Sequence, residues 1–339
     1  MIKNKRNYAI DFLRLVFIII VCIHHFQPSN SIMIIKSGFI VVEFFFILSG
    51  FLLYYNYDKY KELSLSKFII RRLKTLFVDY LIAMVICFVL SVLTYKDQSV
   101  VDFIFKSIPE FFLLQNVGFF YGGINYPLWY ISVMLVSEIL IFIMLQENER
   151  KTIKLVLPIC ILLFYTLIYS NNNSLENFNR DGAFYLPLLR GFAGISVGVL
   201  ACKFHSSQVF DAIKKHKVIC RICELLLYSA TFYLIIFKTN YEFDAVLLFS
   251  LIILNAMNEN SYTYKLFNRN LFKKLGQMSY IIYLNHASFI VAYSYINRHF
   301  INNSYITLAC YIISLLIFAI LYGIIRRLIH KKMQVKQEC

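Results

Sequence analysis

The sequence lacks any cluster of cysteine and histidine residues at the spacing that binds zinc. Its eight cysteines are scattered, mostly inside hydrophobic stretches. Cys220 and Cys223 come closest to such a motif, but they lie where a basic segment enters an apolar stretch, without a second ligand pair. We therefore interpret the cysteines as incidental thiols and expect no metal site.

The sequence also shows no internal repeat, and we expect no soluble domain at either end. Hydrophobic residues make up 59% of the 339 positions, which is typical of a membrane protein with several spans. The formal net charge of +15 would suggest a nucleic-acid partner in a soluble protein. In a membrane protein the positions of the charges set the orientation instead. We therefore expect residues 1–339 to form one membrane domain that binds no nucleic acid.

Ten apolar stretches approach the ~20 residues that are needed to cross a bilayer. They lie near 10–26, 38–55, 76–95, 128–145, 155–170, 186–202, 222–237, 244–258, 275–296 and 305–325. Of the 34 lysine and arginine residues, 26 fall on the side of the N-terminus and six on the other side. This asymmetry predicts an all-α bundle with both termini in the cytoplasm. We expect the apolar segment 96–127 to fold back onto the bundle or to form a partial re-entrant hairpin.

The first stretch contains two ionisable residues, Arg14 and His25. A spacing of eleven residues is almost a whole number of helical turns, so both lie on one face, ~16 Å apart along the axis. Ionisable residues inside a span indicate a functional site. The charge of Arg14 also argues against a cleaved signal peptide and favours an uncleaved first span.

Two further groups of charges suggest chemistry. Glu43 lies in the second stretch at a depth similar to that of His25, an arrangement that suits a histidine base oriented by an acid; the alternative is a buried ion pair that only joins two helices. Arg71, Arg72 and Lys74 form a basic turn in the loop before the third stretch. They are suited to binding phosphates, although such clusters more often set topology and contact lipid head groups.

Several polar residues occur on other spans. Trp129 begins the fourth stretch, Glu138 follows about two and a half turns later, and His286 lies near the middle of the ninth, with Tyr283 close to it on the helix. The alternative interpretation is an interfacial anchor for Trp129 and a satisfied polar residue between helices for Glu138 or His286. Together, ionisable groups on separate spans indicate a polar channel.

Five motifs in order resemble those of the membrane acyltransferase 3 family. They are Arg14 with His25, V-E-F-F-F-I-L-S-G-F at 42–51, F-I-I-R-R-L-K at 68–74, P-L-W-Y-I-S at 127–132 and L-G-Q-M-S-Y-I-I-Y-L-N-H at 275–286. The sequence differs from the family pattern in having Glu43 where many relatives have aspartate, Met134 at a position that is often glutamate, and no second arginine and proline after Arg71 and Arg72.

The resemblance implies a plasma-membrane O-acyltransferase, most often an O-acetyltransferase. It implies that acetyl-CoA or another acyl-CoA binds from the cytoplasm, with Arg71, Arg72 and Lys74 near its phosphates and Arg14 deeper in the channel. His25, oriented by Glu43, then deprotonates a hydroxyl of a cell-surface polysaccharide or lipid-linked glycan precursor, or accepts the acyl group itself. We expect the channel to be lined by Ser49, Trp129, Tyr130, Glu138, Arg190, Tyr283 and His286. The alternative function is a transporter or flippase for a glycan or lipid-linked sugar.

Overall fold

The computed structural model describes residues 6–26, 35–117, 123–176, 180–181, 184–237, 239–301 and 303–338, and these residues are almost entirely helical. The helices are α1 Tyr8–His25, α2 Val41–Tyr55, α3 Leu65–Thr94, α4 Val100–Phe111, α5 Trp129–Lys151, α6 Leu157–Asn172, α7 Leu186–His205, α8 Gln208–Lys215, α9 Lys217–Ile236, α10 Asp244–Ala256, α11 Tyr262–Phe267, α12 Leu275–Ile296 and α13 Ser304–Glu338. Two short antiparallel strands, β1 Arg180–Asp181 and β2 Phe184–Tyr185, precede α7.

Every stretch predicted as a span falls on a helix, but seven helical segments of the described chain are long and apolar enough to cross a membrane. One of them, Tyr126–Asn172, covers both α5 and α6. A straight helix of its 47 residues would be ~70 Å long, more than twice the bilayer core. The backbone leaves the helical conformation at Asn148, and both helices pack against α7. α10 has only 13 residues and α12 is not among the seven segments, so the number of ten spans and the side of the termini remain predictions.

α3 begins earlier than predicted. The sequence predicts Arg71, Arg72 and Lys74 in a loop before the third span, but they lie inside one continuous helix that starts at Leu65. No glycine or proline interrupts the sequence from Ser64 to Thr94, so nothing in it favours a break between the basic turn and the apolar part. The three cations therefore occupy the second and third turns of a helix.

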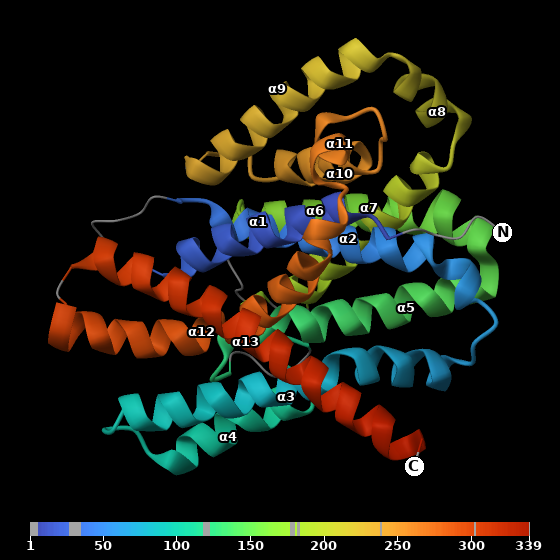
Figure 1. The fold of residues 1–339 in the computed structure, drawn as a ribbon. Coiled ribbons are helices and arrows are strands. Elements are labelled where there is room, and N and C mark those ends of the chain that lie inside the picture. The colour runs from blue at the N-terminus through green and yellow to red at the C-terminus, as the bar shows by residue number, and fades with distance from the viewer. Residues whose placement is uncertain are drawn as a thin grey trace.

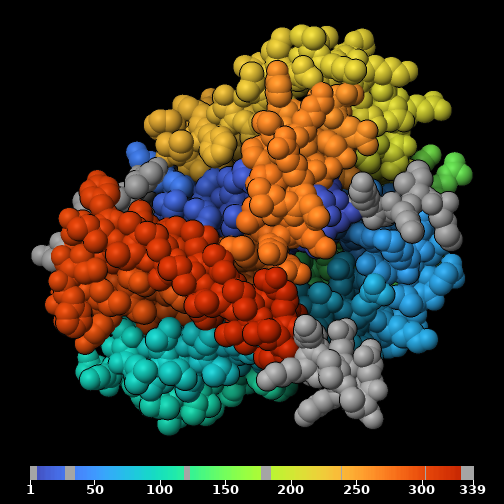
Figure 2. All heavy atoms as spheres, viewed as in Figure 1, coloured from blue at the N-terminus to red at the C-terminus, as the bar shows by residue number. Residues whose placement is uncertain are grey.

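The helices form layers. Figure 1 shows α1, α2, α6 and α7 in a central layer, α8 to α11 over one side of it, and α3 with α4 on the opposite side. α12 packs against α1, α3 and α13, and Figure 2 shows the atoms of α12 and α13 side by side on the face toward the viewer. Apolar side chains on the outside, such as Val85, Leu226 and Ile317, are exposed. A helical bundle with this much exposed apolar surface fits an integral membrane protein.

α2 and α7 approach until their backbones touch. A Cβ atom on Gly50 of α2 would lie 1.9 Å from the carbonyl oxygen of Ile195, and one on Gly198 of α7 would lie 2.0 Å from that of Ile47. Only glycine fits at both places, as at close helix crossings in other membrane proteins. This contact fixes α2, which lies beside the candidate site, against the centre of the bundle.

The described part of segment 96–127 packs against the bundle through α4 and a buried polar cluster. The Glu110 side chain is fully buried, and its Oε1 accepts hydrogen bonds from the Asn125 N–H at 2.8 Å and the Gln115 amide at 3.2 Å. Tyr80 of α3 donates to the Glu110 carbonyl at 2.7 Å. Burial raises the pKa of the Glu110 carboxyl to about 7.

This shift predicts that stability falls as the pH rises. The folded protein holds the Glu110 proton more tightly than the unfolded chain, so ionisation destabilises the fold as the pH passes from the ordinary carboxyl pKa of 4.5 up to about 7. The full effect is on the order of 3 kcal/mol. Glu110→Gln keeps an oxygen acceptor for Asn125 and removes the charge. We expect the unfolding temperature of the purified variant to fall less than that of wild type between about pH 5 and about pH 8.

Asp58→Asn is the matched control, because Asp58 is exposed and forms an ion pair with Lys61 at the surface. Its pH dependence should follow that of wild type. An equal decrease in wild type and Glu110→Gln would show that Glu110 does not titrate in this window.

Candidate functional site

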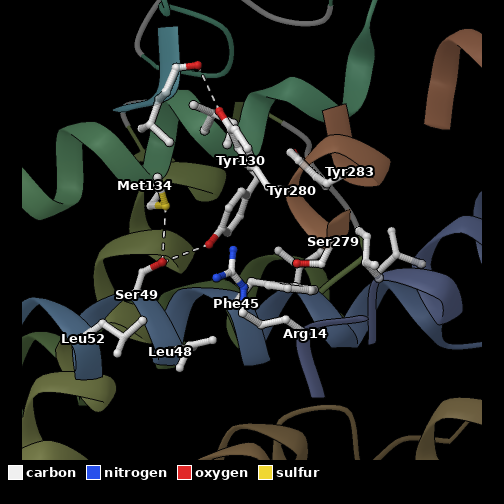
Figure 3. A pocket seen from close by; sticks show the side chains of 15 residues that line it. Arg14, Phe45, Leu48, Ser49, Leu52, Tyr130, Met134, Ser279, Tyr280 and Tyr283 are labelled. Atoms are coloured by element: carbon white, nitrogen blue, oxygen red, sulfur yellow. Dashed lines mark hydrogen bonds between the residues drawn. The ribbon is translucent and has the colours of Figure 1, made fainter. Parts of the chain in front are cut away.

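A cavity of about 160 Å³ lies between α1, α2, α3, α5 and α12. Most of its wall is apolar, and its polar side chains are Arg14, Ser49, Tyr130, Ser279, Tyr280 and Tyr283 (Figure 3). Each helix contributes one face, so residues far apart in the chain meet there. A mostly apolar cavity with a few polar groups is the usual form of a small-molecule site.

Among the described residues of the cavity wall, Arg14 is the only cation. Figure 3 shows its guanidinium pointing into the cavity, toward Ser49 and Tyr130. Asp11, the acid nearest to it on α1, forms an ion pair with Arg6 at 2.6 Å instead. Among the described residues, no side chain forms an ion pair or hydrogen bond with Arg14. An arginine inside a membrane bundle ordinarily has an anionic or carbonyl partner, so this cavity is suited to an anionic or strongly polar ligand.

The tyrosines of the cavity connect its walls. The Tyr130 hydroxyl shares a hydrogen bond with Ser49 Oγ at 3.1 Å, which joins α5 to α2. Tyr280 donates to the Leu76 carbonyl at 3.1 Å, and Tyr283 donates to the Pro127 carbonyl. These bonds hold α12 against α3 and against the start of α5. The predicted channel residues Ser49, Tyr130 and Tyr283 therefore do line one cavity.

The basic group on α3 divides into one paired and two unpaired cations. Arg72 forms an ion pair with Glu138 of α5 at 3.0 Å, with the carboxylate almost completely buried. The guanidinium of Arg71 lies over the Tyr60 ring at 5.0 Å, and Lys74 is exposed. In the described chain neither Arg71 nor Lys74 forms an ion pair, so these two remain available to an anion. Glu138 and Arg72 join two helices, and neither lines the cavity.

Glu43 is buried and forms an ion pair with Arg190, whose Nε lies 2.5 Å from Oε1. Tyr165 donates to the other carboxylate oxygen at 2.8 Å. Arg190 also donates to the carbonyls of Leu175 at 2.8 Å and Phe39 at 3.0 Å. The described contacts of Glu43 do not include one with His25, so an orienting role for Glu43 remains a prediction. Arg190 is enclosed by protein acceptors and does not line the cavity.

His25 ends α1 just beyond the cavity. Val21, one turn earlier, is the last residue of α1 in the cavity wall. The ring centroid of His25 lies 5.4 Å from that of Tyr126 and 5.5 Å from that of His286. On α12, Tyr283 lines the cavity and His286 follows one turn later. From Arg14 toward His25 the cavity thus leads to a pair of imidazoles.

Sequence reasoning missed several contributors. Phe45 and Met134 line the cavity, Tyr126 packs on His25, and Tyr165 binds Glu43. Tyr126 directly precedes the P-L-W-Y-I-S motif, which was the one available indication. Trp129, predicted to line the channel, packs on Phe46 outside the cavity wall. Within the described ranges, no group of three or more histidine, cysteine, aspartate or glutamate side chains is placed to hold a metal ion.

Comparison with known proteins relates the chain to acyltransferases. The chain matches the family described as "Acyltransferase domain" over residues 7–324. It is 24% identical over 322 residues to the peptidoglycan O-acetyltransferase OatA of Listeria monocytogenes, covering 85% of this chain and 50% of OatA. It is also 23% identical over 331 residues to a putative O-acetyltransferase of Staphylococcus aureus strain MSSA476, covering 88% of this chain and 53% of that protein.

The chain therefore spans about half the length of the curated relatives it matches. No solved structure matches it. The match over nearly the whole chain and the five motifs lead to the same conclusion. This protein belongs to the acyltransferase 3 family.

Proposed function

We propose that the protein is an O-acetyltransferase of the plasma membrane, which moves an acetyl group from acetyl-CoA on the cytoplasmic side to a hydroxyl of a cell-surface polysaccharide or lipid-linked glycan precursor. Family membership supports acyl transfer, and the names of the relatives support acetyl as the group and oxygen as the acceptor. The observation that carries the proposal is Arg14, which forms no ion pair or hydrogen bond among the described residues and lies in a cavity that leads to His25.

The donor has the chemistry that this path requires. Coenzyme A carries phosphates at one end and a thioester at the other. Arg71 and Lys74 lie on the outside of α3 without an ion-pair partner among the described residues, so they suit phosphates. Arg14 lies at the cavity, where it suits a polar group of the arm. The mostly apolar wall excludes water from the thioester, which limits wasteful hydrolysis.

His25 supplies the base in this proposal. Its imidazole takes the proton of the acceptor hydroxyl as the new C–O bond forms, and the C–S bond then breaks, with the proton leaving on the coenzyme A thiol. In the alternative route His25 attacks the thioester, carries the acetyl group and transfers it to the acceptor. Both routes need a neutral His25 beside the thioester. Because Glu43 is bound by Arg190, its contribution in this proposal is to hold α2 in place beside the cavity.

One prediction of this proposal concerns binding of the donor. Arg14→Gln should weaken acetyl-CoA binding by about 10-fold to 100-fold, because a hydrogen bond to a charged group contributes roughly 1.5–3 kcal/mol. Binding is measured by titration of the purified protein with labelled acetyl-CoA. Arg327→Gln, on an exposed turn of α13, is the matched control and should bind as wild type does. An unchanged dissociation constant in Arg14→Gln would show that Arg14 does not bind the donor and has a structural role.

The second prediction separates transfer from transport. His25→Ala should lower acetyl transfer by about 10²-fold to 10⁴-fold, the usual contribution of a general base, and should leave donor binding largely intact. The assay follows label from acetyl-CoA into surface glycan or lipid-linked sugar, with exposed His299→Ala as the control. If wild-type protein transfers no label from any acyl-CoA and instead moves a lipid-linked sugar between leaflets, the protein is a transporter.

A further inference from the structure

His286 is completely buried, and among the described residues only one of its ring nitrogens has a hydrogen-bond partner. Its Nδ1 lies 2.5 Å from the carbonyl oxygen of Tyr283, one turn earlier on α12. A carbonyl oxygen accepts and never donates a hydrogen bond, so Nδ1 carries the proton. In the described chain no carboxylate contacts the ring, and an unpaired charge at a buried position is strongly disfavoured. The ring is therefore neutral, with a free electron pair on Nε2.

That Nε2 atom is buried and has no hydrogen-bond partner among the described residues. A buried acceptor without a donor is destabilising and is uncommon unless it has a use. The ring of His25 lies beside the ring of His286, with the centroids 5.5 Å apart and the planes inclined by 33°. The described contacts of His25 include no hydrogen bond, so this imidazole has an N–H to give. The ring that carries this unpaired acceptor is therefore a direct neighbour of His25, whose N–H has no acceptor among the described residues.

We infer that His286 is the positioning residue of His25: its Nε2 accepts the N–H of His25, directly or through one water molecule, and so fixes which His25 nitrogen is free to act as the base. This inference rests on the proposed function. It gives His286 the orienting role that the sequence assigned to Glu43, whose carboxylate is held by Arg190 and Tyr165. The principle is that of catalytic triads, in which an acceptor behind the histidine selects its tautomer.

The reaction gains from this acceptor when the proton moves. The hydroxyl proton passes to the free nitrogen of His25, and the resulting imidazolium donates its second N–H to His286 Nε2. That bond is stronger when its donor is charged, so it stabilises the transition state more than the ground state. As the C–S bond breaks, the proton leaves with the coenzyme A thiol, and both histidines return to their neutral forms.

Three substitutions separate this role from a structural one. Glutamine at 286 places an amide oxygen near the position of Nε2, asparagine places an amide near that of Nδ1, and leucine supplies neither. We expect His286→Leu and His286→Asn to lower kcat by about 10²-fold, the scale of a misplaced catalytic group, with the KM for acetyl-CoA unchanged. His286→Gln should recover to within about tenfold of wild type. A merely structural histidine predicts the opposite order, because asparagine preserves the bond to the Tyr283 carbonyl and glutamine does not.

The same change at another histidine provides the control. His205→Gln, at the far end of α7, should leave kcat unchanged. In a double variant, adding His286→Leu to His25→Ala should cause no further loss, since the two residues act as one unit. Independent, additive losses or better rescue by asparagine than by glutamine would overturn the inference.

The outcome in wild-type protein separates this inference from the function on which it rests. Wild type that transfers no acetyl label refutes the proposed function, and the inference falls with it. Wild type that transfers label alongside an equally active His286→Leu refutes the inference alone. Donor binding by each purified variant shows that it has folded.

Discussion

The buried ion pair between Glu43 and Arg190 is the interaction on which the rest of the bundle depends. It joins α2 to α7, and the backbones of these two helices come into contact further along, at Gly50 and Gly198. Tyr165 binds the second carboxylate oxygen, and two backbone carbonyls bind the other nitrogens of the guanidinium, so both charged groups are hydrogen-bonded. Removing one member of such a pair leaves an uncompensated buried charge and costs roughly 3–5 kcal/mol. Loss of activity on mutating Glu43 would therefore report misfolding as readily as catalysis.

The arginines of the bundle differ in their ion-pair partners. Arg190 and Arg72 each form an ion pair with a buried carboxylate, and Arg326 of α13 binds Asp79 of α3 at 2.6 Å. These pairs join helices and leave little charge to offer a ligand. Arg14 differs, because within the described chain it faces a cavity and pairs with nothing. The same side chain thus stabilises the fold where it is paired and indicates a binding site where it is not.

Much of the helical layout was predictable, because each span depends on local hydrophobicity. Arg14 and His25 share a helix, and their relation follows from helical geometry alone. The partner of Glu43 was not predictable, since Arg190 lies 147 positions away in the chain and no local spacing joins them. The start of α3 was misplaced because its basic turn resembles a loop in composition, although it contains no residue that ends a helix. The cavity combines five helices, so its shape depends on packing that the sequence does not display.

We propose that the thioester-bearing arm of the donor lies in the Arg14 cavity. An acyl-CoA analogue with a photoreactive group on its acyl chain tests this claim directly, by identifying the peptides that it labels in the purified protein. We expect labels on the cavity faces of α1, α2, α5 and α12. An excess of acetyl-CoA should abolish this labelling, and Arg14→Gln should weaken it. Competed labels on α9, α10 or α11, with no effect of Arg14→Gln, would contradict it.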